Sequence, residues 1–113
     1  MIKSSLSLVS ASVLLALTSM VPAHAGVDAD AAQALFKKSD CTKCHAVDKT
    51  KKGPSLKVVA ASYKGKADGQ DKIIKAITTG PKIKQDGAEE AHKIIDTKDP
   101  KELKNLADWI LAQ

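Results

Sequence analysis

The pentapeptide Cys41-Thr42-Lys43-Cys44-His45 constrains this chain more than any other feature. Two thiols at this spacing match the two vinyl groups of one haem, to which they can bond as thioethers. The histidine that follows is then carried beneath the iron as an axial ligand. The motif therefore predicts one covalently attached haem c, held by Cys41 and Cys44, with His45 bound to the iron.

Other uses of a Cys-x-x-Cys pair are weaker hypotheses for this chain. A thioredoxin-like dithiol is expected beside a βαβ pattern, and the sequence has no such alternation. A structural zinc site needs four ligands, whereas residues 26–113 offer two cysteines and two histidines, with no second Cys-x-x-Cys. A disulfide would not require His45. Haem attachment is the leading hypothesis, and a zinc site or a redox dithiol remains the alternative.

Residues 1–25 have the pattern of a secretory signal peptide. Lys3 supplies a positive charge, an apolar stretch runs from Leu6 to Val21, and Ala23-His24-Ala25 is a small-residue cleavage pattern. Serine and threonine interrupt the stretch, which is short for a membrane span. We expect cleavage before Gly26 and no stable membrane insertion afterwards. Residues 26–113 would then form one domain in the periplasm, a compartment outside the cytoplasm that suits thioether attachment.

The positive charge of the chain comes from lysine alone. All 18 basic residues are lysines, and the formal net charge is +5. Such a surface can steer acidic redox-partner proteins into short-lived encounters, although an ordinary solvated surface would have the same composition. Nucleic acid is not an expected partner, because the chain lacks arginine and has few aromatic residues. We expect a monomer with acidic donor and acceptor proteins.

Capping residues and apolar spacing predict an all-α fold of four to five short helices. No segment has the alternation of a β-strand, and residues 82–98 are expected to form an irregular polar stretch. At the last helix, Glu102 is expected to complete a capping box with Asp99. The predicted helices begin at Asp28 or Asp30, at Ser55, at Asp68 or Asp71, and at Asp99-Pro100. The first three are predicted to end near Lys38, Gly65 and Gly80-Pro81.

These residues together resemble a small bacterial class I cytochrome c, of the c551 or c8 type, over essentially all of residues 26–113. The resemblance rests on Leu35-Phe36, the haem motif, Gly53-Pro54 and the segment 106–110, Leu-Ala-Asp-Trp-Ile. It implies the cytochrome c fold, in which short helices wrap around one covalently attached haem. It also implies that the first and last helices cross at Phe36 and Trp109, with Ala32 allowing their close approach.

The resemblance further implies a role for Pro54. In this family the carbonyl of this proline accepts the Nδ1 proton of the proximal histidine, here His45. Such a hydrogen bond fixes the tautomer and orientation of a metal-bound imidazole. Pro54 is therefore expected to contribute to the haem site.

The sequence departs from the family at the other axial position. Class I cytochromes c normally bind the far side of the iron with a methionine before the last helix, but Met1 and Met20 both lie in the predicted signal peptide. His92 stands at the corresponding place, and we expect it to be the second iron ligand. Ligation by Lys82, Lys84 or Lys93, or an open distal position, remains an alternative.

Two firm axial ligands leave no open position on the iron, so the implied function is one-electron transfer and the chain is not expected to be an enzyme. Imidazole in place of methionine should lower the reduction potential. The predicted protein is a periplasmic monohaem electron carrier. The alternative is a haem protein that binds gases or other small ligands, because His92 and Gly87 lie in a polar loop that could release the iron. An electron-accepting enzyme subunit is less favoured in so short a chain.

Overall fold

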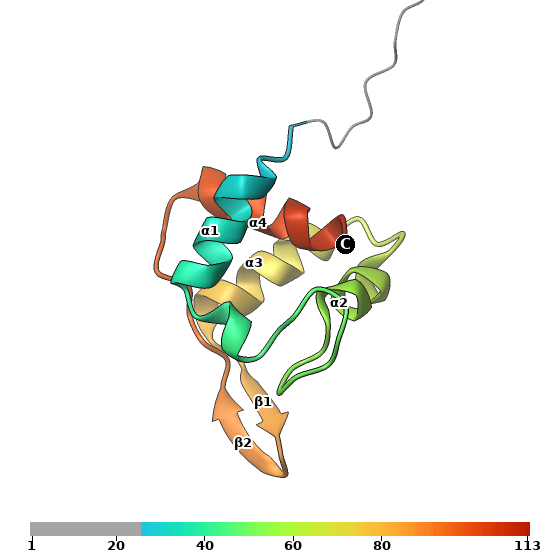
Figure 1. Ribbon diagram of the computed structural model, residues 1–113, viewed down its shortest axis with the longest axis vertical. Coiled ribbons are helices and arrows are strands. Elements are labelled where there is room, and N and C mark those ends of the chain that lie inside the picture. Colours follow the sequence, from blue (N-terminus) through green and yellow to red (C-terminus); the bar gives the residue numbers. More distant parts are fainter. Residues whose placement is uncertain (1–25) are drawn as a thin grey trace, which may run out of the picture.

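The computed structural model describes residues 26–113, and the predicted signal peptide lies outside the described residues. Four helices form the body of the molecule, and a short hairpin projects from it (Figure 1). Within the described part of the chain, no helix is both long and apolar enough to cross a bilayer. The elements are α1 (Ala29–Lys38), the 3-10 turn η1 (Cys41–Lys43), α2 (Leu56–Tyr63), α3 (Gly69–Thr79), β1 (Lys82–Gln85), β2 (Ala88–Ala91) and α4 (Pro100–Leu111).

Three of the helices begin at side-chain caps, as their sequences predict. Asp28 accepts a hydrogen bond from the Ala31 N–H at 2.9 Å, and Ser55 Oγ accepts one from the Val58 N–H at 3.2 Å. Asp99 likewise accepts from the N–H of Lys101, and Pro100 occupies the first helical position. Each cap pairs a backbone donor that the helix cannot satisfy internally. The predicted all-helical body is confirmed.

The capping box predicted at the last helix is wrong. The Glu102 carboxylate accepts a hydrogen bond from the Thr97 hydroxyl and does not turn back to the Asp99 N–H. That N–H donates instead to Thr97 Oγ1 at 3.1 Å. The threonine two residues before the cap therefore satisfies the donor that Glu102 was expected to take.

The core is built on the crossing of α1 and α4, which lie against each other at the top of Figure 1. The rings of Phe36 and Trp109 meet edge to face, with centroids 5.6 Å apart and planes at 63°. Ala32 is 1% exposed and Ala107 is fully buried, so small side chains let the two helices approach closely. The aromatic contact implied by the family resemblance is confirmed.

The prediction that residues 82–98 contain no strand is also wrong. β1 and β2 pair as an antiparallel hairpin in which Lys82 faces Ala91 and Gln85 faces Ala88. Asp86 and Gly87 form its turn, with φ angles of 48° and 80°. The hairpin buries none of its residues, so its formation depends on the turn and on backbone pairing. Apolar alternation is therefore missing from its sequence.

Candidate functional site

The two cysteines lie in a tight turn that directly follows α1. Asp40 enters the turn in the left-handed conformation with φ 60°. The N–H groups of Cys44 and His45 both donate to the carbonyl of Cys41, at 3.2 and 2.9 Å. Both thiols are half-buried and free of a disulfide, and burial raises the pKa of Cys41 above its ordinary value. The turn thus gathers two thiols and one imidazole within five consecutive residues.

His45 is fixed by the segment that follows it. Its Nδ1 lies 2.7 Å from the carbonyl oxygen of Pro54. A carbonyl can only accept, so Nδ1 is the nitrogen that donates in this hydrogen bond. Gly53 packs on the same ring, because a Cβ built at this position would lie 2.7 Å from His45 Cε1. The Gly53 N–H also donates to the Cys44 carbonyl at 2.7 Å. We call residues 40–54 the proximal arm.

His92 lies directly after the hairpin. Its backbone N–H donates to the carbonyl of Pro81 at 2.8 Å, so β1 and β2 hold its position in the chain. Its Nδ1 lies 2.9 Å from the carbonyl oxygen of Lys93, to which it donates in the same way. The next anchor is the Ile95 N–H, which donates to the Ile77 carbonyl at 2.8 Å. We call residues 80–95 the distal arm.

The fold brings the two histidines together although 46 residues separate them. Their ring centroids are 6.2 Å apart and their planes are tilted by 40°. Both side chains are half-buried. Within residues 26–113 no hydrogen bond engages Nε2 of either ring, whereas both Nδ1 atoms are paired with carbonyls. The site therefore offers two imidazoles whose Nε2 atoms have no hydrogen-bond partner among the described residues.

The donor set fits a haem better than a zinc ion. Two free thiols and two imidazoles whose Nε2 atoms are not hydrogen-bonded match a thioether-linked porphyrin with nitrogen ligands on both sides. Within the described residues, no three His, Cys, Asp or Glu side chains converge tightly enough to hold a metal ion by themselves. A closed zinc site would require such a cluster.

A charged contact joins the two arms. Lys93 Nζ lies 2.6 Å from a carboxylate oxygen of Asp40, the residue before Cys41, and Lys43 lies 3.4 Å from the same oxygen. These two lysines hold the pKa of Asp40 below its ordinary value, with the Lys93 hydrogen bond the larger cause. Lys93 thus orients His92 with its carbonyl and reaches the haem motif with its ammonium group. No sequence pattern singles out this pair among so many charged residues.

A second contact joins the arms through the hairpin. The Gln85 side chain donates to the carbonyl of Lys52 at 2.5 Å. Gln85 ends β1, whereas Lys52 lies in the loop between the haem motif and Gly53. The strand that precedes His92 is therefore tied to the loop that follows His45.

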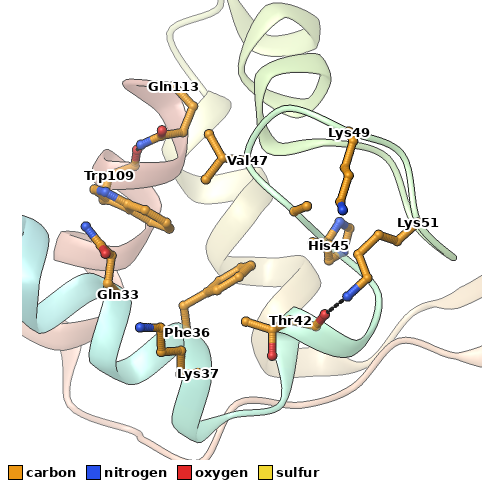
Figure 2. Close-up of a pocket in the computed structure, with 11 residues that line it drawn as sticks. Gln33, Phe36, Lys37, Thr42, His45, Val47, Lys49, Lys51, Trp109 and Gln113 are labelled. Atoms are coloured by element: carbon orange, nitrogen blue, oxygen red, sulfur yellow. Dashed lines mark hydrogen bonds between the residues drawn. The ribbon is translucent and has the colours of Figure 1, made fainter.

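A groove of about 390 Å³ opens beside His45. Figure 2 shows the side chains around it, contributed by α1, the haem motif, the loop after it and the end of α4. Of the predicted haem-site side chains Cys41, Cys44, His45 and His92, only His45 lines it. Its walls are formed by Gln33, Phe36, Lys37, Thr42, His45, Ala46, Val47, Lys49, Lys51, Trp109 and Gln113.

Comparisons with known proteins point to one family. Residues 29–113 match the family described as cytochrome c. The chain is 37% identical over 78 residues to cytochrome c-551 of Pseudomonas denitrificans, covering 69% of this chain and 92% of that protein. The structure of class 1 cytochrome MtoD from Sideroxydans lithotrophicus ES-1 superposes with a TM-score of 0.73 at 53% identity, over 76% of this chain and 96% of that one. The structure of Nitrosomonas europaea cytochrome c552 superposes with a TM-score of 0.56 at 30% identity, over 70% of this chain and 95% of that one.

Proposed function

This chain belongs to the cytochrome c family and carries one covalently attached haem c, and we propose that His45 and His92 are the two ligands of its iron. As a monohaem cytochrome c it is an electron carrier. The finer proposal is a periplasmic carrier with a lowered reduction potential. Cys41 and Cys44 would hold the haem through thioether bonds.

The observation that carries the proposal is the relation between the two imidazoles. Metal–imidazole bonds are about 2 Å long, and two such bonds plus the distance from each ring centre to its nitrogen are consistent with centroids 6.2 Å apart. Both rings have Nδ1 paired with a carbonyl, which leaves Nε2 as the ligating atom. His92 therefore has the chemical state that His45 needs for the same task.

Lysine ligation has less support than histidine ligation. The ammonium group of Lys93 is paired with Asp40, and this contact raises the pKa of Lys93 further above its ordinary value. Lysine must lose a proton before it can bind iron. Lys82 and Lys84 are exposed on β1, where water stabilises their charged form.

Electron transfer is favoured over gas binding because the distal arm is anchored on both sides of its histidine. Backbone hydrogen bonds hold His92 and Ile95, and the ion pair of Lys93 with Asp40 closes the gap between them. In the proposed function, one electron passes from a donor protein to the oxidised haem and leaves again to an acceptor, and no bond is formed or broken. The lowered potential follows because imidazole donates more strongly to the iron than a methionine thioether does.

The cellular setting is part of the proposal. The signal-peptide pattern of residues 1–25 supports export and cleavage before Gly26. The lysine-rich surface supports donor and acceptor proteins with acidic faces, met in brief encounters by a monomer. A mass spectrum of the holoprotein from the periplasm would test both the cleavage position and the two thioether bonds.

The axial ligand is tested by replacing His92 with methionine. The wild-type protein should give the electron paramagnetic resonance signal of low-spin iron with two nitrogen ligands. His92→Met should gain the near-infrared charge-transfer band of a thioether–iron bond, and its potential should rise within the range of about 0.8 V that axial ligands span. Ile94→Met is the matched control, because Ile94 is 53% exposed and only two residues away.

Two results would contradict the proposal. One is a wild-type spectrum with a thioether or high-spin signature. The other is a His92→Met spectrum indistinguishable from that of Ile94→Met, which would mean that residue 92 does not face the iron.

A further inference from the structure

The groove beside His45 has an apolar interior that no described residue fills. Phe36 and Trp109 form one side of it and Val47 the other, as Figure 2 shows. Val47 is 37% exposed, which makes it one of three large apolar side chains that the described surface presents to solvent. The volume of about 390 Å³ is within the range of pockets that bind ligands. The groove can therefore take up a large apolar side chain.

The rim of the groove is positive. Lys37, Lys49 and Lys51 line it, and no aspartate or glutamate does. None of these three lysines forms an ion pair within residues 26–113. Lys51 donates to the carbonyl of Thr42, which also lines the groove, so its ammonium group stays beside the groove. The missing counter-charges must come from water or from a partner.

The groove also includes the edge of the proposed proximal ligand. His45 belongs to its wall, whereas His92, Cys41 and Cys44 do not. A segment seated here would lie against the proximal imidazole and not across the space between the two histidines. Contact at this place brings a redox partner close to the iron from the side of His45.

We propose that this groove is the docking site for an acidic segment of a redox-partner protein, which inserts an aromatic side chain between Val47 and Trp109. Carboxylates that flank the aromatic residue pair with Lys37 and Lys49. A protein segment is favoured over a free anion because the groove combines an apolar interior with separated cations. The proposal rests on the proposed function as a carrier, which requires brief encounters with proteins.

The test uses the reduced, haem-loaded protein labelled with nitrogen-15 and the capped peptide Glu-Glu-Trp-Glu-Glu. Titration should give saturable shifts of the Val47 amide and the Trp109 indole N–H. The double variant Lys37→Gln/Lys49→Gln should weaken binding by about two- to twentyfold, since two exposed charge pairs are lost. Val47→Thr should weaken it further, because an exposed hydroxyl disfavours the apolar insertion.

The matched control is Lys75→Gln/Lys101→Gln, which removes the same charge from exposed lysines outside the groove. Equal weakening by both double variants, or shifts spread over the whole lysine surface, would overturn the docking site. An absence of binding at millimolar peptide would overturn it as well.

The wild-type haem spectrum separates this test from that of the proposed function. Unchanged two-nitrogen ligation with no groove binding would leave the carrier proposal standing and remove only the docking site. A wild-type spectrum without that signature would remove the ligation proposal whatever the peptide does.

Discussion

The proximal and distal arms bring chemically similar imidazoles to one place by different means. His45 is held within a short stretch of chain: its partner Pro54 is nine residues away, and Gly53 packs on its ring. The turn before it closes through hydrogen bonds to the Cys41 carbonyl. The hydrogen bond and the glycine contact that orient this ring both come from residues 41–54, so the proximal arm is a local structure.

The distal arm depends on contacts between distant parts of the chain. Lys93 pairs with Asp40 across 53 residues, and Gln85 reaches Lys52 across 33. His92 itself is tied to Pro81 through the hairpin. Few of these contacts are buried, so the distal arm should open at a lower free energy than the proximal arm does.

One proposed axial ligand is thus positioned by a sequence motif, whereas the other is positioned by the fold. A local arm forms whenever its few residues are present, whereas a long-range arm needs the helices to be packed first. Disturbing the distal arm should therefore change ligand exchange at the iron with little loss of stability. Disturbing the proximal arm should change both the ligand exchange and the stability of the protein.

The largest difference is expected when each histidine is removed. His92→Ala leaves the proximal arm intact, so imidazole added to the buffer should restore the low-spin spectrum completely. His45→Ala also removes the partner of the Pro54 carbonyl and the ring that packs on Gly53, so rescue should be partial. Absorption spectra during an imidazole titration measure both. Equal rescue of the two variants would show that the arms do not differ.

A methyl group at residue 53 should disturb the proximal arm next most strongly. The new Cβ of Gly53→Ala would lie 2.7 Å from His45 Cε1 and 3.1 Å from the Cys44 carbonyl oxygen, so ring and backbone must shift. Overpacking of this kind costs about 1–3 kcal/mol. Denaturant unfolding should show this loss together with an altered haem spectrum. Gly26→Ala, where a Cβ meets nothing within 4 Å, should change neither.

The helices and the proximal arm could be predicted because their signals are local. Caps such as Asp28, Ser55 and Asp99 lie beside the N–H groups that they pair. The hairpin was missed because apolar alternation was the criterion for a strand, and β1 and β2 bury no side chain. The dipeptide Asp86-Gly87, a common turn in two-residue hairpins, was the signal that could have found it.

The long-range contacts could not be predicted from the sequence. The chain has 18 lysines and 13 acidic residues, so no rule selects Lys93 as the partner of Asp40 before the fold is known. For the same reason, the sequence does not reveal that the Asp99 N–H donates to Thr97 Oγ1 instead of to the Glu102 carboxylate. His92 was found as a candidate only because its place in the family pattern is normally held by methionine. Contacts made by tertiary packing need the structure.

Gly80→Ala tests the distal arm through the backbone. Gly80 has φ 61°, and a Cβ there would lie 3.0 Å from the His92 carbonyl oxygen and 3.1 Å from Ile94 Cγ1. The left-handed conformation alone costs about 1–2 kcal/mol for a non-glycine residue. Gly65→Ala supplies the matched control, with φ 74° and open space around its Cβ. Both variants should lose the stability that the left-handed conformation costs, and Gly80→Ala should lose more because of its two close contacts. Only Gly80→Ala should bind cyanide faster than the wild type.

The smallest effect is expected from the ion pair that joins the arms. Both partners are about half exposed, with side-chain exposures of 54% for Lys93 and 40% for Asp40, so water and salt screen the pair. Asp40→Asn and Lys93→Gln should leave global stability almost unchanged and still accelerate cyanide binding slightly, with the effect fading at high salt. Lys43→Gln removes the other lysine beside Asp40 and should leave the rate unchanged, because Lys43 has no link to His92.

The pH dependence of the same pair follows from its two pKa shifts. The folded protein lowers the pKa of Asp40 below 3.8, so this carboxylate stabilises the distal arm above that pH and loses its effect as the pH falls through the lowered value. The pKa of Lys93 is raised above 10.5, so its contribution is present below that pH and is lost as the pH rises through the raised value. At moderate ionic strength, the ratio of the cyanide binding rates of Lys93→Gln and wild type should therefore stay constant between these limits and fall towards one beyond them. A ratio that changes near neutral pH would mean that another group controls the opening of the distal arm.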